Sequence, residues 1–198
     1  DEGDWFSGAE CGVAWNANSS WHGTQVAGTI AALSRNALGV AGVAFGSKVQ
    51  PVRALGKCGG ALSDIADAIV WASGGTVAGV PANPTPAKVI NMSIGGGGAC
   101  GATYQAAIDA AVARGTTVVV AAGNSNQDAA AFRPANCANV VTVAAANRQG
   151  ARASYSNFGA VVDVTAPGGQ MDVLGSNGVL STLNAGTTKQ AAQTYAYY

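Results

Sequence analysis

Residues 116–122 form an unbroken run of β-branched and small apolar side chains, Thr-Thr-Val-Val-Val-Ala-Ala. A run without polar alternation is typical of a parallel strand that is covered on both faces. Four further strands are expected at 49–55, 88–94, 140–146 and 161–166. The first of these contains Pro51, which lacks a backbone N–H, so that strand is expected at an edge or irregular position of the sheet.

Two segments with helical spacing of apolar residues lie between these strands. Ser63 is expected to cap a helix at 64–73 that ends at the glycine pair 74–75, and a second helix is expected at 103–114. Alternating strands and helices predict right-handed βαβ crossovers. The fold class is therefore α/β, three-layer α/β/α with a mostly parallel central sheet, in a single domain over residues 1–198.

The charge balance gives no sign of a nucleic-acid or membrane partner. Ten basic residues balance ten acidic ones, and no Lys/Arg cluster stands out. No segment reaches the roughly 20 apolar residues needed to span a bilayer. The acidic residues 1–4 are not followed by the apolar region of a signal peptide. A mature secreted protein would also lack a signal peptide, because it is removed during export.

The four cysteines are widely separated and form no CxxC pair, which argues against a zinc or dithiol redox site. An even count suits two disulfides in an exported protein, although four small buried thiols are the alternative. The spacing leaves all three pairings open. The residues are Cys11, Cys58, Cys100 and Cys137.

His22 is the single histidine, placed where the polar segment Ser19-Ser20-Trp21 passes into a helix of small apolar residues. A partly exposed imidazole at a helix start is suited to act as a general base near neutral pH. The glycines of this helix allow other backbone to approach closely. Taken alone, such a residue is more often an ordinary surface or capping histidine.

Asn124 follows the 116–122 run in the order Ala121-Ala122-Gly123-Asn124. In open α/β sheets, ligands meet the carboxyl ends of the strands. An Asn there can aim its side-chain N–H at a developing oxyanion, whereas the alternative is an Asn that hydrogen-bonds its own turn.

Two glycine-containing segments can offer bare backbone to an extended peptide, Ser93-Ile94-Gly95 at a strand end and Gly59-Gly60 as the opposite wall. Flexible turns are the alternative. The segment 96–101 also matches G-x-G-x-x-G, but the next strand does not end in the acid that a dinucleotide-binding fold needs. A nucleotide cofactor is therefore not expected.

Four segments together resemble the subtilases, the family of subtilisin-like serine proteases. Residues 19–32 (SSWHGTQVAGTIAA) are similar to the histidine motif, and 91–96 (NMSIGG) to the substrate-binding strand. Residues 118–124 (VVVAAGN) are similar to the oxyanion strand, and 162–168 (VDVTAPG) to a later strand-to-loop segment. They occur in family order over almost the whole chain, and the cysteine-containing segments look closer to the secreted bacterial members.

The resemblance implies roles for single residues. His22 would be the general base, and Asn124 the side-chain oxyanion donor. Asp163 would provide an acid for a structural calcium ion, and no cofactor is required for the chemistry. By position in that fold, the cysteines would pair as Cys11–Cys58 and Cys100–Cys137. The residues that would bind substrate are Gly59, Gly60, Ser93, Ile94, Gly95, Ala121, Ala122 and Gly123.

The family also implies a secreted, monomeric enzyme with polypeptide substrates and with a propeptide or protein inhibitor as partner. The chain departs from it in two motifs. Asp1 and Asp4 do not match the catalytic acid motif, which follows an apolar strand. No G-T-S-M-A serine motif occurs. The most similar segment is 185–190 (AGTTKQ), in which Thr188 is expected to lie in a loop. The domain is therefore expected to be truncated at both ends and inactive alone; a non-catalytic peptide-binding relative is the alternative.

Overall fold

The computed structural model describes residues 3–170 and 177–198. Within that part of the chain, no helix combines the length and apolar character needed to cross a membrane. The chain divides into two compact units. The terminal unit consists of Asp1–Ala61 with Val173–Tyr198, and the central unit consists of Leu62–Asp172. Asp1, which was compared above with the catalytic acid motif, lies outside the described residues.

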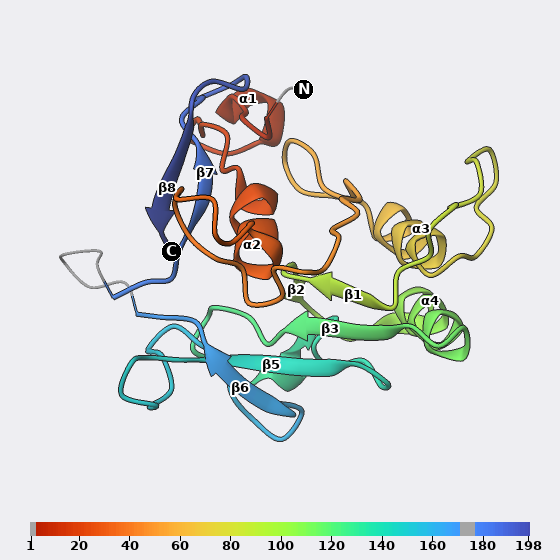
Figure 1. Ribbon diagram of the computed structural model, residues 1–198. Helices are drawn as coiled ribbons and strands as arrows, with labels where there is room; N and C mark the ends of the chain where they lie inside the picture. The colour runs from red at the N-terminus through yellow and green to blue at the C-terminus, as the bar shows by residue number, and fades with distance from the viewer. Residues whose placement is uncertain (1–2, 171–176) are drawn as a thin grey trace. The chain divides into compact units, whose positions relative to one another are not determined.

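The central unit contains a four-stranded parallel sheet, in the order β1-β3-β5-β6 (Figure 1). Neighbouring strands are in parallel register, with Val120 opposite Met92 on one side and opposite Thr142 on the other. The expected α/β class and parallel sheet are confirmed. The strands are β1 (Val89–Met92), β3 (Thr117–Ala121), β5 (Val141–Ala146) and β6 (Val164–Pro167).

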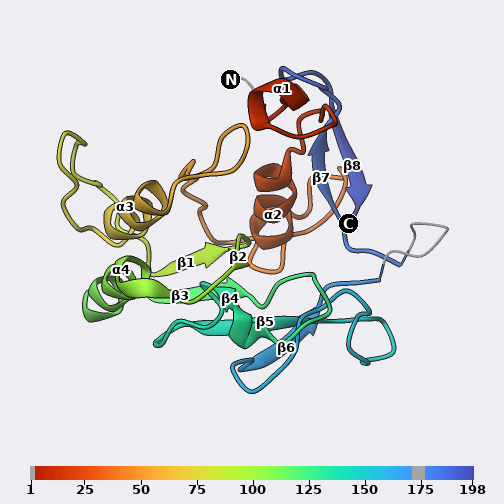
Figure 2. The ribbon, with the colours of Figure 1, turned by 180° about the vertical axis from the view of Figure 1, so that it is seen from behind.

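Two helices of the central unit, α3 (Leu62–Ala72) and α4 (Gly101–Ala113), lie beside each other in both views (Figures 1 and 2). The apolar core of the unit includes Ile108 of α4 and Val118 and Val120 of β3, each at most 1% exposed. The expected cap at Ser63 is wrong. Because α3 already begins at Leu62, Ser63 lies inside the first turn, where its hydroxyl donates to Asp64.

The expected strand at 49–55 is also wrong, because this segment is irregular. Val49 and Val52 are 42% and 38% exposed. Pro51 contributes no N–H, and no described strand pairs with the segment, so its backbone has no partner with which to form a ladder. The apolar residues that favoured a strand do not enter the sheet.

A second, antiparallel pair in the central unit joins β2 (Gly96–Gly97) to β4 (Phe132–Arg133). A 3₁₀ turn, η1 (Ala129–Ala131), leads into β4. The Cys100–Cys137 disulfide links the segments that follow these two short strands. The glycine-rich segment that matched G-x-G-x-x-G is therefore, in part, one half of a small sheet.

The terminal unit is built from α1 (Gly8–Cys11), α2 (His22–Ala31) and an antiparallel strand pair that the sequence did not predict. The strands are β7 (Leu180–Asn184) and β8 (Gln193–Tyr197), and β7 lies between α2 and β8 in both views (Figures 1 and 2). Residues close to the start and to the end of the chain therefore share one unit.

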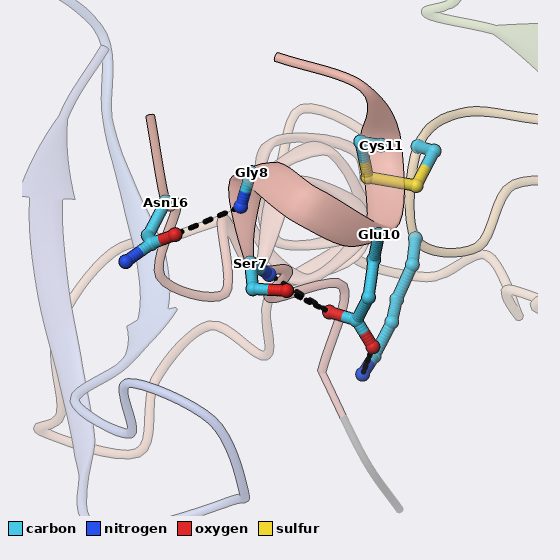
Figure 3. Close-up of polar contacts among 7 residues, drawn as sticks. Ser7, Gly8, Glu10, Cys11 and Asn16 are labelled. Carbon is cyan, nitrogen blue, oxygen red and sulfur yellow. Dashed lines mark hydrogen bonds and ion pairs between the residues drawn. A yellow bond between two sulfur atoms is a disulfide. The ribbon is translucent and has the colours of Figure 1, made fainter. Parts of the chain in front are cut away.

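The short helix α1 is fixed at both ends (Figure 3). The Glu10 carboxylate accepts hydrogen bonds from the backbone N–H and the hydroxyl of Ser7, at 2.8 and 3.0 Å. Cys11, its last residue, forms a disulfide with Cys58. The structure thus contains the two disulfides that the resemblance implied.

Candidate active site

A pocket of about 370 Å³ lies in the central unit, at the carboxyl ends of β1 and β3. This is the edge of a parallel sheet at which α/β proteins bind ligands. The pocket brings together twelve residues from three segments of the chain. They are Ser93, Ile94, Gly95, Gly96, Gly97, Ala121, Ala122, Gly123, Asn124, Ser125, Phe132 and Arg133.

Asn124 lies at the edge of this pocket with an exposed side chain. Its carboxamide has no hydrogen-bond partner among the described residues. The amide is therefore not used to close its own turn, which was the alternative considered from the sequence. A free N–H donor beside a pocket is the arrangement that oxyanion stabilisation requires.

The residue before Asn124 has to be glycine for two reasons. Gly123 has a φ of +107°, which residues with a side chain rarely adopt. A Cβ built on it would also lie 2.4 Å from the Nδ2 atom of Asn157. The turn that presents Asn124 therefore depends on a close approach between backbone and a buried side chain.

The predicted peptide wall at Ser93-Ile94-Gly95 lines the same pocket as Asn124. Gly95 passes close to the chain before Pro134, because a Cβ on it would lie 3.1 Å from the Arg133 carbonyl oxygen. The wall is thus partly exposed backbone at the end of β1, supported from one side by β4. This suits pairing with an extended peptide.

The sequence did not single out Ser125, Phe132 or Arg133 as pocket residues. Phe132 and Arg133 reach the pocket because β4 pairs with β2, with Gly97 opposite Phe132. Two-residue strands carry no readable periodicity. The usable signal was the pairing of Cys100 with Cys137, which draws the segment 132–137 toward the glycine-rich segment.

His22 is the first residue of α2 in the terminal unit, and its side chain is exposed. A chain of hydrogen bonds fixes its backbone: the His22 N–H donates to the Ser20 hydroxyl at 3.2 Å, and that hydroxyl donates to Asp4 at 2.6 Å. The imidazole itself has no hydrogen-bond partner among the described residues. The role of His22 as a general base stays a prediction.

Asp4 also accepts from the Ser20 backbone N–H at 2.7 Å. Partial burial disfavours the charged carboxylate, but the hydrogen bonds from Ser20 outweigh it and hold the pKa of Asp4 below its usual value. Asp4 is thus a structural acid at the start of the His22 helix.

The connection between β7 and β8 holds the segment before His22. The indole N–H of Trp21 donates to the Gly186 carbonyl at 2.5 Å, and the Ser19 N–H donates to the Thr187 carbonyl at 2.7 Å. The Thr188 carbonyl accepts from the Ser19 hydroxyl at 3.1 Å. Thr188 therefore lies in a loop whose backbone braces the histidine segment.

Gly59 and Gly60, the second predicted peptide wall, belong to the terminal unit. Gly59 is exposed, has a φ of +102° and forms an antiparallel bridge with Gly56. These residues form a tight turn next to the Cys11–Cys58 disulfide. Their place opposite the Ser93 wall stays a prediction, as does the meeting of His22 with Asn124.

Asp163 precedes β6, and its carboxylate accepts a hydrogen bond from the Thr142 N–H at 2.8 Å. No group of three His, Cys, Asp or Glu side chains in the described residues could hold a metal ion. Ca²⁺ takes six to eight oxygen ligands. The Asp163 carboxylate, one oxygen of which already accepts a hydrogen bond, would therefore need backbone carbonyls to complete a site. Calcium binding at Asp163 stays a prediction.

Comparison with known proteins gives one consistent result. An extracellular protease of Xanthomonas campestris pv. campestris is 62% identical over 199 residues, covering 100% of this chain and 33% of the relative. An extracellular basic protease of Dichelobacter nodosus is 48% identical over 200 residues, covering 98% of this chain and 32% of the relative. The chain thus spans about one third of the length of these curated relatives.

A solved structure of a protease from Pseudoalteromonas arctica PAMC 21717 superimposes with a TM-score of 0.97 at 55% identity, covering 100% of this chain and 59% of that one. The Peptidase S8 model, which describes the subtilase family, matches residues 8–198. The chain therefore belongs to the subtilase family.

Proposed function

We propose that these residues form part of a secreted serine endopeptidase that hydrolyses peptide bonds through an acyl-enzyme. The observation that carries the proposal is the pocket of the central unit. There the unpartnered carboxamide of Asn124 lies beside the bare backbone of Ser93-Ile94-Gly95. A peptide paired with that backbone would present a carbonyl to the amide donor.

In this proposal His22 is the general base. It takes the proton of the serine hydroxyl as the oxygen attacks the scissile carbonyl, and later gives that proton to the leaving amine. The Asn124 amide donates to the oxyanion of the tetrahedral intermediate. Ala121, Ala122 and Gly123 line the pocket that receives the neighbouring substrate side chain.

The nucleophile and the catalytic acid come, in this proposal, from segments outside these 198 residues. No serine motif occurs within them, and Thr188 is held in a loop through its backbone. Asp4 is engaged by Ser20 and starts no family acid motif. Residues 1–198 alone are therefore expected to be a single incomplete peptidase domain without proteolytic activity.

Two disulfides support secretion, because such bonds persist in oxidising compartments. The names of the Xanthomonas and Dichelobacter relatives, both called extracellular, support the same proposal. Polypeptides are the proposed substrates. A propeptide or protein inhibitor would occupy the same pocket edge, and the enzyme is proposed to act as a monomer.

The test compares residues 1–198 with the complete protease, which we define as these residues joined to the segments that supply the acid and the serine. A fluorophosphonate should label the complete protease and leave residues 1–198 unlabelled. His22→Ala should abolish labelling. Asn124→Ala should lower kcat by roughly 100-fold to 1000-fold.

Asn147→Ala is the control, because it removes a carboxamide of the same kind from an Asn that does not line the pocket. It should leave kcat and KM unchanged. Labelling of residues 1–198 alone would contradict the proposed absence of a nucleophile. A complete chain that binds peptides without being labelled would instead be the non-catalytic peptide binder.

A further inference from the structure

Asn157 is fully buried, at 0% exposed, and lies behind the turn that carries Asn124. Its Oδ1 atom accepts from the backbone N–H groups of Ser125 at 2.9 Å and Gln127 at 3.1 Å. Its Nδ2 atom donates to the Ala122 carbonyl at 2.9 Å. Beyond the end of β3 at Ala121, this one side chain thus provides hydrogen-bond partners for the backbone of the turn.

The backbone of Asn157 adds a fourth contact, because its N–H donates to the Gly123 carbonyl at 2.9 Å. The hydrogen bonds therefore engage the residues on both sides of Asn124 and leave Asn124 itself free. Gly123 permits this approach, since a Cβ there would overlap Nδ2. The pattern fixes the backbone of the turn and keeps the amide of Asn124 available.

Asn157 is in turn anchored to the sheet. The Ser156 hydroxyl donates to the Asn157 carbonyl at 2.9 Å and accepts from the Ala145 N–H of β5 at 2.9 Å. Ser156 is 1% exposed. The turn is therefore connected to the neighbouring strand through two consecutive buried polar residues. Buried networks in which every member is satisfied are rigid.

We propose that Asn157 is the positioning residue of the oxyanion donor. The inference rests on the proposed function. An oxyanion donor must be held within about 0.5 Å of its productive position to be effective. The Asn124 side chain has no internal hydrogen bond, so the backbone turn sets its place. Asn157 sets that turn and does not line the pocket.

The test is a double-mutant cycle in the complete protease with Asn157→Ala and Asn124→Ala. Asn157→Ala should lower kcat by roughly 10-fold to 100-fold and change KM by less than about 3-fold, because the lost interaction acts in the transition state. In the Asn124→Ala background, the same substitution should lower kcat by less than about 2-fold. A general structural role would give the same loss in both backgrounds.

Asn147→Ala again serves as the control, because its Oδ1 accepts from two backbone N–H groups, those of Gln149 and Ala151, as Asn157 does. It should change neither kcat nor KM. If Asn157→Ala does not fold, Asn157→Ser enters the same cycle. It removes the carboxamide that bonds to Ser125, Gln127 and Ala122 and keeps a small neutral polar side chain at this buried position, so it should show the same dependence on Asn124.

Equal losses in the two backgrounds, a loss confined to KM, or no loss would overturn the positioning role while leaving the proposed function intact. An Asn124→Ala enzyme with the wild-type kcat would overturn the proposed function itself, and the positioning role with it. The two failures are therefore distinguishable, because the Asn124→Ala single variant tests the proposed function and the double-mutant cycle tests the positioning role.

Discussion

Gly28 in the interior of α2 gives a test in which helix propensity and packing predict opposite signs. Gly28→Ala should stabilise an isolated helix by about 1 kcal/mol. In the structure, however, a Cβ at Gly28 would lie 2.0 Å from the Thr182 Oγ1 atom and 2.6 Å from the Ser181 Oγ atom of β7. The added methyl group has no room.

The two hydroxyls cannot move away without a loss, because they donate to the carbonyls of Thr24 and Gln25 at 2.9 and 2.7 Å. Losing both hydrogen bonds costs about 2 kcal/mol, and overpacking adds at least about 1 kcal/mol. Subtracting the propensity gain leaves a net destabilisation of about 2 kcal/mol. For a chain of this size, that corresponds to a Tm lower by about 4–8 °C.

The assay is thermal and urea unfolding of residues 1–198, followed by circular dichroism. Gly23→Ala is the matched control in the same helix, because a Cβ built there has no described atom within 4 Å apart from its chain neighbours and the nearby backbone of its own helix. It should be neutral or stabilising by up to about 1 kcal/mol. A Gly28→Ala chain as stable as the wild type would refute the packing argument.

Three further predictions concern stability. Because folding lowers the pKa of Asp4, this carboxylate stabilises the folded state. Its contribution to the free energy of unfolding is complete above the usual pKa of 3.8 and is lost as the pH falls through the folded-state pKa. Asp4→Asn should therefore destabilise at pH 7 and flatten the pH dependence of unfolding in acid. Replacing Cys100 and Cys137 by Ala should cost about 4 kcal/mol for the 37-residue separation, measured by urea unfolding against the intact chain. Asn83→Ala should cost about 1–3 kcal/mol by the same measurement, because its buried amide donates to two carbonyls at the end of α3. For each variant, an unfolding transition equal to that of the wild type would contradict the prediction.

The parallel sheet was predictable because its strands are local apolar runs between helical segments. The 116–122 run became β3 with an error of one residue at each end. The run at 49–55 was misread because apolar residues alone do not supply a hydrogen-bonding neighbour. The strands β7 and β8 were missed because Thr, Asn and Gln interrupt the apolar pattern, and because β7 packs against α2, which lies about 150 residues earlier in the chain.

The pocket was predictable where a motif and a strand end coincide, as at Ser93 and Asn124. Phe132 and Arg133 escaped because a two-residue strand has no period. Asn157 escaped for a different reason: a buried Asn between Ser156 and Phe158 looks like any loop residue in a sequence. Its importance comes from three backbone groups that lie 30 to 35 residues earlier in the chain.

The bracing of His22 by the β7–β8 connection has a consequence during synthesis. Residues 19–25 bond to residues 181–188, so their contacts close over more than 150 positions. A ribosome adding about 5–20 residues per second needs roughly 10–30 s to bridge that interval. Until then the segment around the imidazole has none of these partners. The nascent chain therefore passes through a period in which the histidine has been translated but its surroundings have not yet been assembled.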